Sequence, residues 1–216
     1  MIKNINLISL EKYLLEKKKL RLMIKFTGLS KVNTAIFISG TGSNFKNLIK
    51  FSLLKKSPIK ISLLVSSNSQ AKGLKYATKY KIKKKIFKFK NQLVDEKKIL
   101  HYLKKNKINF ICLAGFMKIL SKNFIKNFKG KIVNIHPSLL PKYKGLNTHY
   151  RAIKNKDKFS GCTVHYVTSK LDSGKIILQK KVKIIKKDTP FSLAKKVLKN
   201  EHKIYPKAIM KIFTNL

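Results

Sequence analysis

Short apolar runs alternate with amphipathic stretches through most of this 216-residue chain. Apolar runs of roughly four to eight residues are typical of buried strands, whereas apolar residues at helical spacing are typical of helices that pack on a sheet. The alternation predicts a parallel sheet with crossover helices, because parallel neighbours need long connections. The expected strands are 34–39, 59–65, 82–87, 110–114 and 132–135, and the expected helices are 44–54, 72–79, 94–105 and 123–128.

The pattern changes after Gly145. A helix is expected at 148–155, followed by strands at 162–167 and 175–185. Residues 172–174, Asp-Ser-Gly, are a turn signal between these strands, which can therefore pair as a long hairpin.

The last helix is expected to follow Thr189, which is suited to be its N-cap because Pro190 comes next. It runs to about Phe213, and Pro206 is expected to kink or interrupt it. The whole pattern predicts an α/β, Rossmann-like fold of three layers, with a mostly parallel sheet and a C-terminal β-hairpin and helix.

The domain is expected to span 32–216, after a basic and loosely ordered N-terminal extension at 1–31. This extension has neither the continuous apolar stretch nor the cleavage site of a secretory signal. Glu11 and Glu16 also argue against a transit peptide. Alternatively, the extension results from an upstream start codon, with Met23 as the internal start.

The net charge of +43 raises the question of nucleic-acid binding. Lysine supplies nearly all of this charge, with arginine only at Arg21 and Arg151, whereas nucleic-acid readers favour arginine for phosphates and guanine edges. The lysines are also spread along the whole chain. We therefore expect no specific nucleic-acid partner, but salt-sensitive attraction to anionic polymers and substrates.

Two further features concern location. No apolar run reaches the roughly 18 residues that span a bilayer, so no membrane association is expected. Cys112 and Cys162 lie in apolar, strand-like segments without metal-site spacing. This placement favours reduced core residues and a cytoplasmic protein.

The main candidate site is the stretch NIHPSLLP at 134–141, which follows an apolar strand. Alternate side chains of a strand share a face, so Asn134 and His136 point the same way while Ile135 points into the core. Pro137 ends the strand because it has no N–H to donate. The pair then lies at the C-terminal end of a strand, where open α/β sheets bind ligands. The alternative is an Asn and a His that only satisfy loop backbone.

A second candidate is GTGSN at 40–44, between the first strand and the first helix. Glycines let backbone N–H groups approach a ligand closely, and a helix N-terminus favours an anion, so a phosphate is the expected occupant. The stretch is neither a Walker loop nor a G-x-G-x-x-G motif. The alternative is a tight turn in which Ser43 or Asn44 only caps the helix.

The chain has only eight acidic residues, so an acidic side chain beside a candidate site is less often one that merely covers the surface. Asp172 lies in the hairpin turn and Glu201 in the last helix. A carboxylate near His136 would raise the pKa of the imidazole and help keep it protonated and oriented. Together with Asn134, such a pair can perform acyl transfer, with donors for a developing oxyanion and a carboxylate that manages protons. No serine or cysteine is placed to act as a nucleophile, and the five histidines lack the spacing of a metal site.

Five motifs in register resemble those of the phosphoribosylglycinamide formyltransferase family, the folate-dependent transferases of purine synthesis. The resemblance covers about 33–214, nearly everything except the extension. The motifs are ISGTGSN at 38–44, LAGFMKIL at 113–120, NIHPSLLP at 134–141, GCTVH at 161–165 with LDSG at 171–174, and EHKIYP at 201–206.

The resemblance implies that Asn134, His136 and Asp172 are catalytic. His136 would donate to the formyl oxygen as the substrate amine attacks and a tetrahedral intermediate forms, and Asn134 would hold the same oxygen. Asp172 would pair with His136 and assist proton transfer from the amine.

The resemblance also implies the substrates, which are 10-formyltetrahydrofolate and glycinamide ribonucleotide, with no metal. Gly42, Ser43 and Asn44 would hold the phosphate, and Glu201 would contact the ribose or glycinamide end. A monomer or weak homodimer is expected. The implied folate-binding residues are Gln92, Met117, Lys118, Ile119, Leu120, Asn134, Val167, Thr168 and Leu171.

Three positions depart from the family pattern. Lys118 stands where arginine is common, and Gln92 lies near an often basic position that faces the folate tail. Lys144 replaces a frequent proline, which is expected to loosen the loop before Gly145. None of the three removes a catalytic group.

Other functions predict different features. Methionyl-tRNA formyltransferase carries an additional C-terminal domain, and formyltetrahydrofolate deformylase carries an N-terminal regulatory domain and needs no phosphate site. A basic RNA-binding protein on a degenerate transferase scaffold would dispense with the catalytic trio, whereas this chain retains it.

Overall fold

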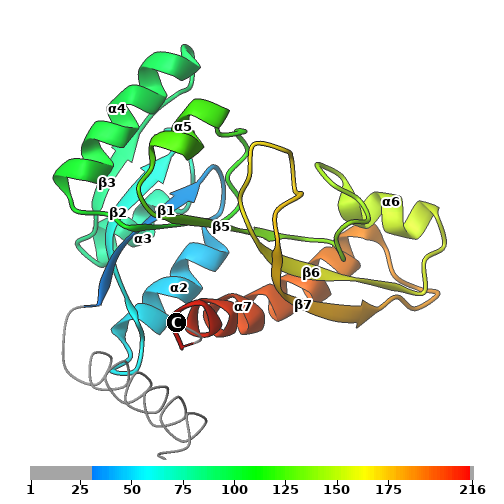
Figure 1. Cartoon of the computed structure of the whole chain (residues 1–216). Coiled ribbons are helices and arrows are strands. Elements are labelled where there is room, and N and C mark those ends of the chain that lie inside the picture. Colours follow the sequence, from blue (N-terminus) through cyan, green and yellow to red (C-terminus); the bar gives the residue numbers. More distant parts are fainter. Residues whose placement is uncertain (1–30, 215–216) are drawn as a thin grey trace, which may run out of the picture.

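The computed structural model describes residues 31–214, so the expected extension lies outside the described residues except for Lys31 (Figure 1). A seven-stranded sheet carries helices on both faces, as the sequence predicts. Each predicted strand and helix of this part is present, with boundaries that differ by a few residues at most.

The strand order is β3-β2-β1-β4-β5-β6-β7. The first five strands in this order pair in parallel, and the last two pair antiparallel. The edge strand β3 is exposed and contains three lysines, which discourage pairing with another chain. The strands are β1 (Val32–Ile38), β2 (Ile59–Ser66), β3 (Lys83–Ile86), β4 (Phe110–Leu113), β5 (Lys131–His136), β6 (Phe159–Tyr166) and β7 (Ile176–Lys183).

Two apolar cores lie on the two faces of the sheet, because alternate residues of β1 belong to different cores. Ile36 and Ile38 pack with α2 and α7, whereas Ala35 and Phe37 pack with α4 and α5. Figure 1 shows these helices as layers on either side of the sheet. The helices are α2 (Ser43–Leu53), α3 (Leu74–Lys79), α4 (Gln92–Lys105), α5 (Lys122–Asn127), α6 (Thr148–Lys154) and α7 (Pro190–Thr214).

The C-terminal hairpin extends the sheet beyond β5. β6 and β7 pair with each other as predicted, and β6 also pairs antiparallel with β5. The second pairing places Asn134 directly opposite His165. The hairpin thereby brings its turn, which contains Asp172, to the C-terminal end of β5.

Helix α7 begins as predicted and is not interrupted at Pro206. Thr189 caps it, since its Oγ1 accepts a hydrogen bond from Ser192 N at 3.2 Å. The expected interruption is wrong, because α7 continues to Thr214. A proline removes the bond to the carbonyl four residues earlier. In this chain that carbonyl, His202 O, accepts from Asn47 Nδ2 at 2.7 Å instead.

The strand order reverses between β1 and β4, and open α/β sheets bind their ligands at the carboxyl ends of strands at such a point. The loops that follow these two strands are tied together. Ser39 N donates to Gly115 O at 3.0 Å, and Met117 N donates to Ser39 Oγ at 2.8 Å. Candidate residues from distant parts of the sequence therefore meet at this edge.

Cys112 and Cys162 are free and buried, as expected. Burial raises the pKa of both thiols, to about 12 for Cys162. None of the helices within residues 31–214 is long and apolar enough to cross a membrane.

Asp188 fixes the start of α7. Its carboxylate accepts from Ile185 N at 2.9 Å and from Ser192 Oγ at 2.8 Å, and it pairs with Lys196 Nζ at 2.7 Å. The Ile185 N–H, followed by Lys196, lowers the pKa of Asp188 from 3.8 to about 2. The ionised carboxylate is therefore the form that stabilises the fold.

We predict that Asp188→Ala lowers the free energy of unfolding by about 1–2 kcal/mol at pH 7, as measured by urea unfolding. Because the folded pKa lies below the unfolded value, this contribution is present above about pH 4 and is lost as the pH falls from about 4 to about 2. The difference in the free energy of unfolding between wild type and variant should therefore be smaller at pH 3 than at pH 7. An equal difference at pH 7 and pH 3 would contradict the assignment.

Candidate active site

Asn134 and His136 lie at the C-terminal end of β5 with their side chains on one face, as predicted. Ile135 packs in the core on the opposite face, and β5 ends at His136, directly before Pro137. His136 is only 5% exposed. The pair therefore lies in a protected position at the edge of the sheet where ligands bind.

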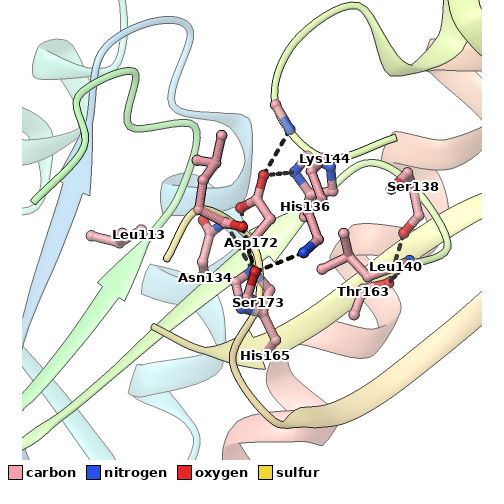
Figure 2. A network of polar contacts seen from close by, with 12 residues as sticks. Leu113, Asn134, His136, Ser138, Leu140, Lys144, Thr163, His165, Asp172 and Ser173 are labelled. Atoms are coloured by element: carbon pink, nitrogen blue, oxygen red, sulfur yellow. Dashed lines mark hydrogen bonds and ion pairs between the residues drawn. The ribbon is translucent and has the colours of Figure 1, made fainter. Parts of the chain in front are cut away.

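The ring of His136 is held at both nitrogens. Nε2 lies 2.8 Å from the carbonyl oxygen of Tyr143. Nδ1 lies 3.4 Å from Oδ2 of Asp172 (Figure 2). A carbonyl oxygen only accepts hydrogen bonds, so Nε2 must carry a proton. The proton that His136 gains or loses is therefore the one on Nδ1, beside Asp172.

Burial lowers the pKa of His136 more than the Tyr143 carbonyl and the Asp172 charge raise it. The Asp172 charge raises this pKa, as expected, although the net shift is downward. The carboxylate does favour the imidazolium, but the low exposure of the ring outweighs it. The result is a stronger acid at Nδ1 than an ordinary histidine offers.

Asp172 is held by contacts from several directions. Its Oδ2 accepts from Gly145 N at 2.9 Å, and its Oδ1 lies 3.6 Å from Nε2 of His165. Burial raises the pKa of Asp172, but the contacts with His165, Gly145 and His136 together lower it below its usual value. Asp172 therefore remains an ionised carboxylate beside His136, the catalytic candidate.

His165 belongs to the site, although the sequence analysis gave it no role. It is 2% exposed, and its Nε2 lies 3.3 Å from Nδ2 of Asn134. Its Nδ1 lies 2.8 Å from the Tyr166 carbonyl, which only accepts hydrogen bonds, so Nδ1 carries a proton, while Nε2 faces both Asn134 and Asp172. One N–H of the Asn134 amide faces His165, and the other remains for a ligand.

A cavity of about 670 Å³ opens beside these residues. It extends from the loop after β4 to α6 and α7. Of the predicted site residues, it is lined by Asn44, Met117, Lys118, Ile119, Asn134, His136, Leu171, Asp172 and Glu201. The catalytic candidates therefore share one cavity with Asn44 and with part of the folate-site candidates, whereas Gly42 and Ser43 do not line it.

A smaller hollow of about 80 Å³ adjoins the same side chains. It is lined by the predicted residues Leu120, Val167 and Thr168, among others. Gln92 lines neither cavity, because its Nε2 donates to Ile119 O at 2.8 Å and to Glu96 Oε1 at 2.9 Å. In this structure Gln92 holds the loop that lines both cavities.

Helix α2 begins without a side-chain cap. Its N-cap is Gly42, in a left-handed conformation with φ of 71°, and no side chain bonds the first turn. A Cβ at Gly42 would lie 2.6 Å from the Cα of Gly73, so glycine is also required for close approach of the two loops. The alternative in which Ser43 or Asn44 caps the helix is not what the structure shows.

Asn44 and Glu201 join α2 to α7 at the cavity wall. Asn44 Nδ2 donates to Glu201 Oε2 at 2.6 Å, whereas the buried Oδ1 of Asn44 has no hydrogen-bond partner. Burial raises the pKa of Glu201, and the bond from Asn44 opposes this. The Glu201 carboxyl group thus offers an acceptor at the cavity wall that a ligand hydroxyl or N–H can use.

The arrangement suits direct transfer of an acyl group. Asn134 and His136 offer N–H donors to a developing oxyanion, and Asp172 offers a proton acceptor. Ser138 is buried, and its Oγ donates to Lys142 O at 2.6 Å, so it is not presented as a nucleophile. Within residues 31–214, no group of three or more His, Cys, Asp or Glu side chains is arranged to hold a metal ion.

Known proteins match both the sequence and the fold. A family model described as formyl transferase matches residues 32–209. Phosphoribosylglycinamide formyltransferase of Haemophilus influenzae is 41% identical over 183 residues, which are 83% of this chain and 86% of that protein. The crystal structure of phosphoribosylglycinamide formyltransferase from Anaplasma phagocytophilum superposes with a TM-score of 0.81 at 40% identity, over 86% of this chain and 88% of that one.

A longer protein also matches. The human trifunctional purine biosynthetic protein adenosine-3 is 39% identical over 182 residues, which are 83% of this chain. The match spans only 18% of the length of that human protein.

We predict that Asp172→Asn lowers the pKa of His136, because the Asp172 charge raises that pKa in the native site. The pKa can be followed by NMR titration of the His136 ring carbons and protons. The exposed His101 on α4 serves as an internal control for effects that do not come from the site. An unchanged His136 pKa in a folded variant would show that Asp172 exerts no charge effect on the ring.

Proposed function

The chain belongs to the formyl transferase family, and we propose that it transfers the formyl group of 10-formyltetrahydrofolate to the amine of glycinamide ribonucleotide. The observation that carries this proposal is the cavity that joins Asn134, His136 and Asp172 to the uncapped start of α2. Such a cavity can bind an acceptor by its phosphate and present its amine to the reacting group.

In the first step, the amine nitrogen of the acceptor attacks the formyl carbon and the carbonyl oxygen becomes an oxyanion. Nδ1–H of protonated His136 donates to this oxygen, and so does the N–H of Asn134 that does not face His165. Both donors are fixed before reaction, which is the condition under which such groups stabilise an oxyanion most.

In the second step, the tetrahedral intermediate loses a proton from its new C–N nitrogen and then expels the folate nitrogen. Asp172 accepts the proton, directly or through a water molecule, because its lowered pKa keeps it ionised. The bond between the formyl carbon and the folate nitrogen breaks, and that nitrogen takes up the proton that Asp172 accepted, directly or through a water molecule. The products are formylglycinamide ribonucleotide and tetrahydrofolate.

The acceptor is placed by groups from α2 and α7. The backbone N–H groups of Gly42, Ser43 and Asn44 would hold the phosphate, supported by the positive end of the α2 dipole. Glu201, joined to Asn44, would accept from the ribose or glycinamide end. A phosphorylated amine is therefore favoured over water as the acceptor.

The folate would occupy the part of the cavity between the loop after β4 and the hairpin turn. Met117 and Ile119 are 64% and 61% exposed there, and Leu171 is 47% exposed. Apolar side chains with this exposure around a cavity are suited to a flat heterocycle. We also propose that residues 32–216 carry the activity and that the enzyme works in the cytoplasm, in keeping with its two free thiols.

The reaction is tested with the purified full chain, by following the absorbance of the folate product with and without glycinamide ribonucleotide. We expect turnover that requires the ribonucleotide. Turnover without it would indicate a deformylase instead. No turnover, together with RNA affinity that falls steeply with salt, would indicate the basic RNA-binding protein.

We predict that His136→Ala lowers kcat by roughly a hundredfold or more, because it removes a positioned donor to the oxyanion. The variant should fold, as judged by circular dichroism and thermal melting. His101→Ala is the matched control, since that histidine is exposed on α4. A His136→Ala enzyme with the kcat of wild type would exclude the proposed donor role.

A further inference from the structure

The carbonyl that holds His136 belongs to a residue in an uncommon conformation. Tyr143 has a φ of 55°, in the left-handed region. For a residue with a Cβ this conformation is unfavourable relative to ordinary backbone. Something in the surrounding structure must therefore keep Tyr143 in place and its carbonyl oxygen 2.8 Å from Nε2 of His136.

The side chain of Tyr143 is anchored at its far end. Its hydroxyl donates to Oδ2 of Asp157 at 2.9 Å and accepts from Nδ2 of Asn155 at 2.9 Å. The guanidinium of Arg151 lies over the ring, 4.9 Å from its centre. The Asp157 side chain is only 15% exposed, so its charge-assisted bond to the phenol is partly shielded from water.

This anchor lies outside the cavity that would bind the substrates. Neither Tyr143 nor Asp157 lines the 670 Å³ cavity or the smaller hollow. Their direct contact with the site is made by the Tyr143 backbone, whose carbonyl accepts from His136. A change in the anchor should therefore act on the imidazole without removing a substrate contact.

We propose that Tyr143 and Asp157 are positioning residues that set the proton state of His136, an inference that rests on the proposed function. The bond between phenol and carboxylate holds the backbone of Tyr143 so that its carbonyl fixes the proton on Nε2. This leaves Nδ1 as the nitrogen that exchanges the catalytic proton. The carbonyl also raises the pKa of His136 against the effect of burial.

Several charged or titratable groups besides this anchor face His136. They are Asp172 from the hairpin turn, His165 from β6, and His149 and Arg151 from α6. These groups are unchanged when the Tyr143 hydroxyl is removed, although Arg151 also contacts the Tyr143 ring. Tyr143→Phe keeps that ring, and with it the arginine contact, so it isolates the bond to Asp157.

The test compares Tyr143→Phe with wild type in the formyl transfer assay across pH. We expect kcat to fall roughly threefold to tenfold, the effect of losing one hydrogen bond, with KM for both substrates unchanged. A looser carbonyl contact lowers the pKa of His136, and protonated His136 is the active form. The loss of activity as the pH rises should therefore begin at lower pH than in wild type.

Lys142→Met is the matched control. Lys142 pairs with the same carboxylate, with Nζ 3.1 Å from Oδ1 and 3.3 Å from Oδ2 of Asp157 and 5.9 Å from the centre of the Tyr143 ring, but its side chain is 65% exposed and makes no hydrogen bond to the phenol. We expect the pH profile and kcat of this variant to equal those of wild type. If Lys142→Met reproduced the effect of Tyr143→Phe, the anchor as proposed would be wrong.

An NMR titration of His136 gives a readout that needs no activity. We expect its pKa to be lower in Tyr143→Phe than in wild type. An equal pKa together with an equal kcat would overturn the inference. If Tyr143→Phe did not fold, Asp157→Asn, which removes the charge and keeps the shape, would be judged by the same two measurements. A wild-type chain without formyl transfer would refute the proposed function, while the pKa comparison would still decide the role of the anchor.

Discussion

The imidazole of His136 is fixed at both nitrogens, and the chemistry of the site follows from that constraint. The Tyr143 carbonyl accepts from Nε2, so the titrating proton is on Nδ1, where Asp172 lies 3.4 Å away. A buried imidazole without these partners would lose its proton readily, because burial penalises the charged form. The carbonyl and the carboxylate oppose this loss and fix which nitrogen exchanges the proton, in a ring that is only 5% exposed.

The topology of the sheet supplies the partners of this ring. β5 is the last parallel strand, and the antiparallel β6 beside it places His165 opposite Asn134. The turn between β6 and β7 then brings Asp172 to the end of β5. On the other side, the reversal between β1 and β4 brings Asn44 and the loop after β4 to the same cavity.

Local pattern and chemistry predicted much of this site. Alternation along β5 placed Asn134 and His136 on one face, and the hairpin signal placed Asp172 in a turn. The sequence alone does not predict that β6 pairs with β5, because that pairing joins strands that are separated along the chain. His165 was therefore assigned no role. The sequence also could not give the sign of the His136 pKa shift, because burial depends on the whole fold. The carbonyl of Tyr143 has no signature in sequence, since every residue carries one.

The most direct test of this account is the tautomer of neutral His136, measured from the ¹⁵N chemical shifts of its ring in the wild-type chain. We expect a neutral ring protonated at Nε2, with Nδ1 unprotonated toward Asp172. A neutral ring protonated at Nδ1 would contradict it. The Tyr143 carbonyl would then face an unprotonated nitrogen, and another group would have to orient the imidazole.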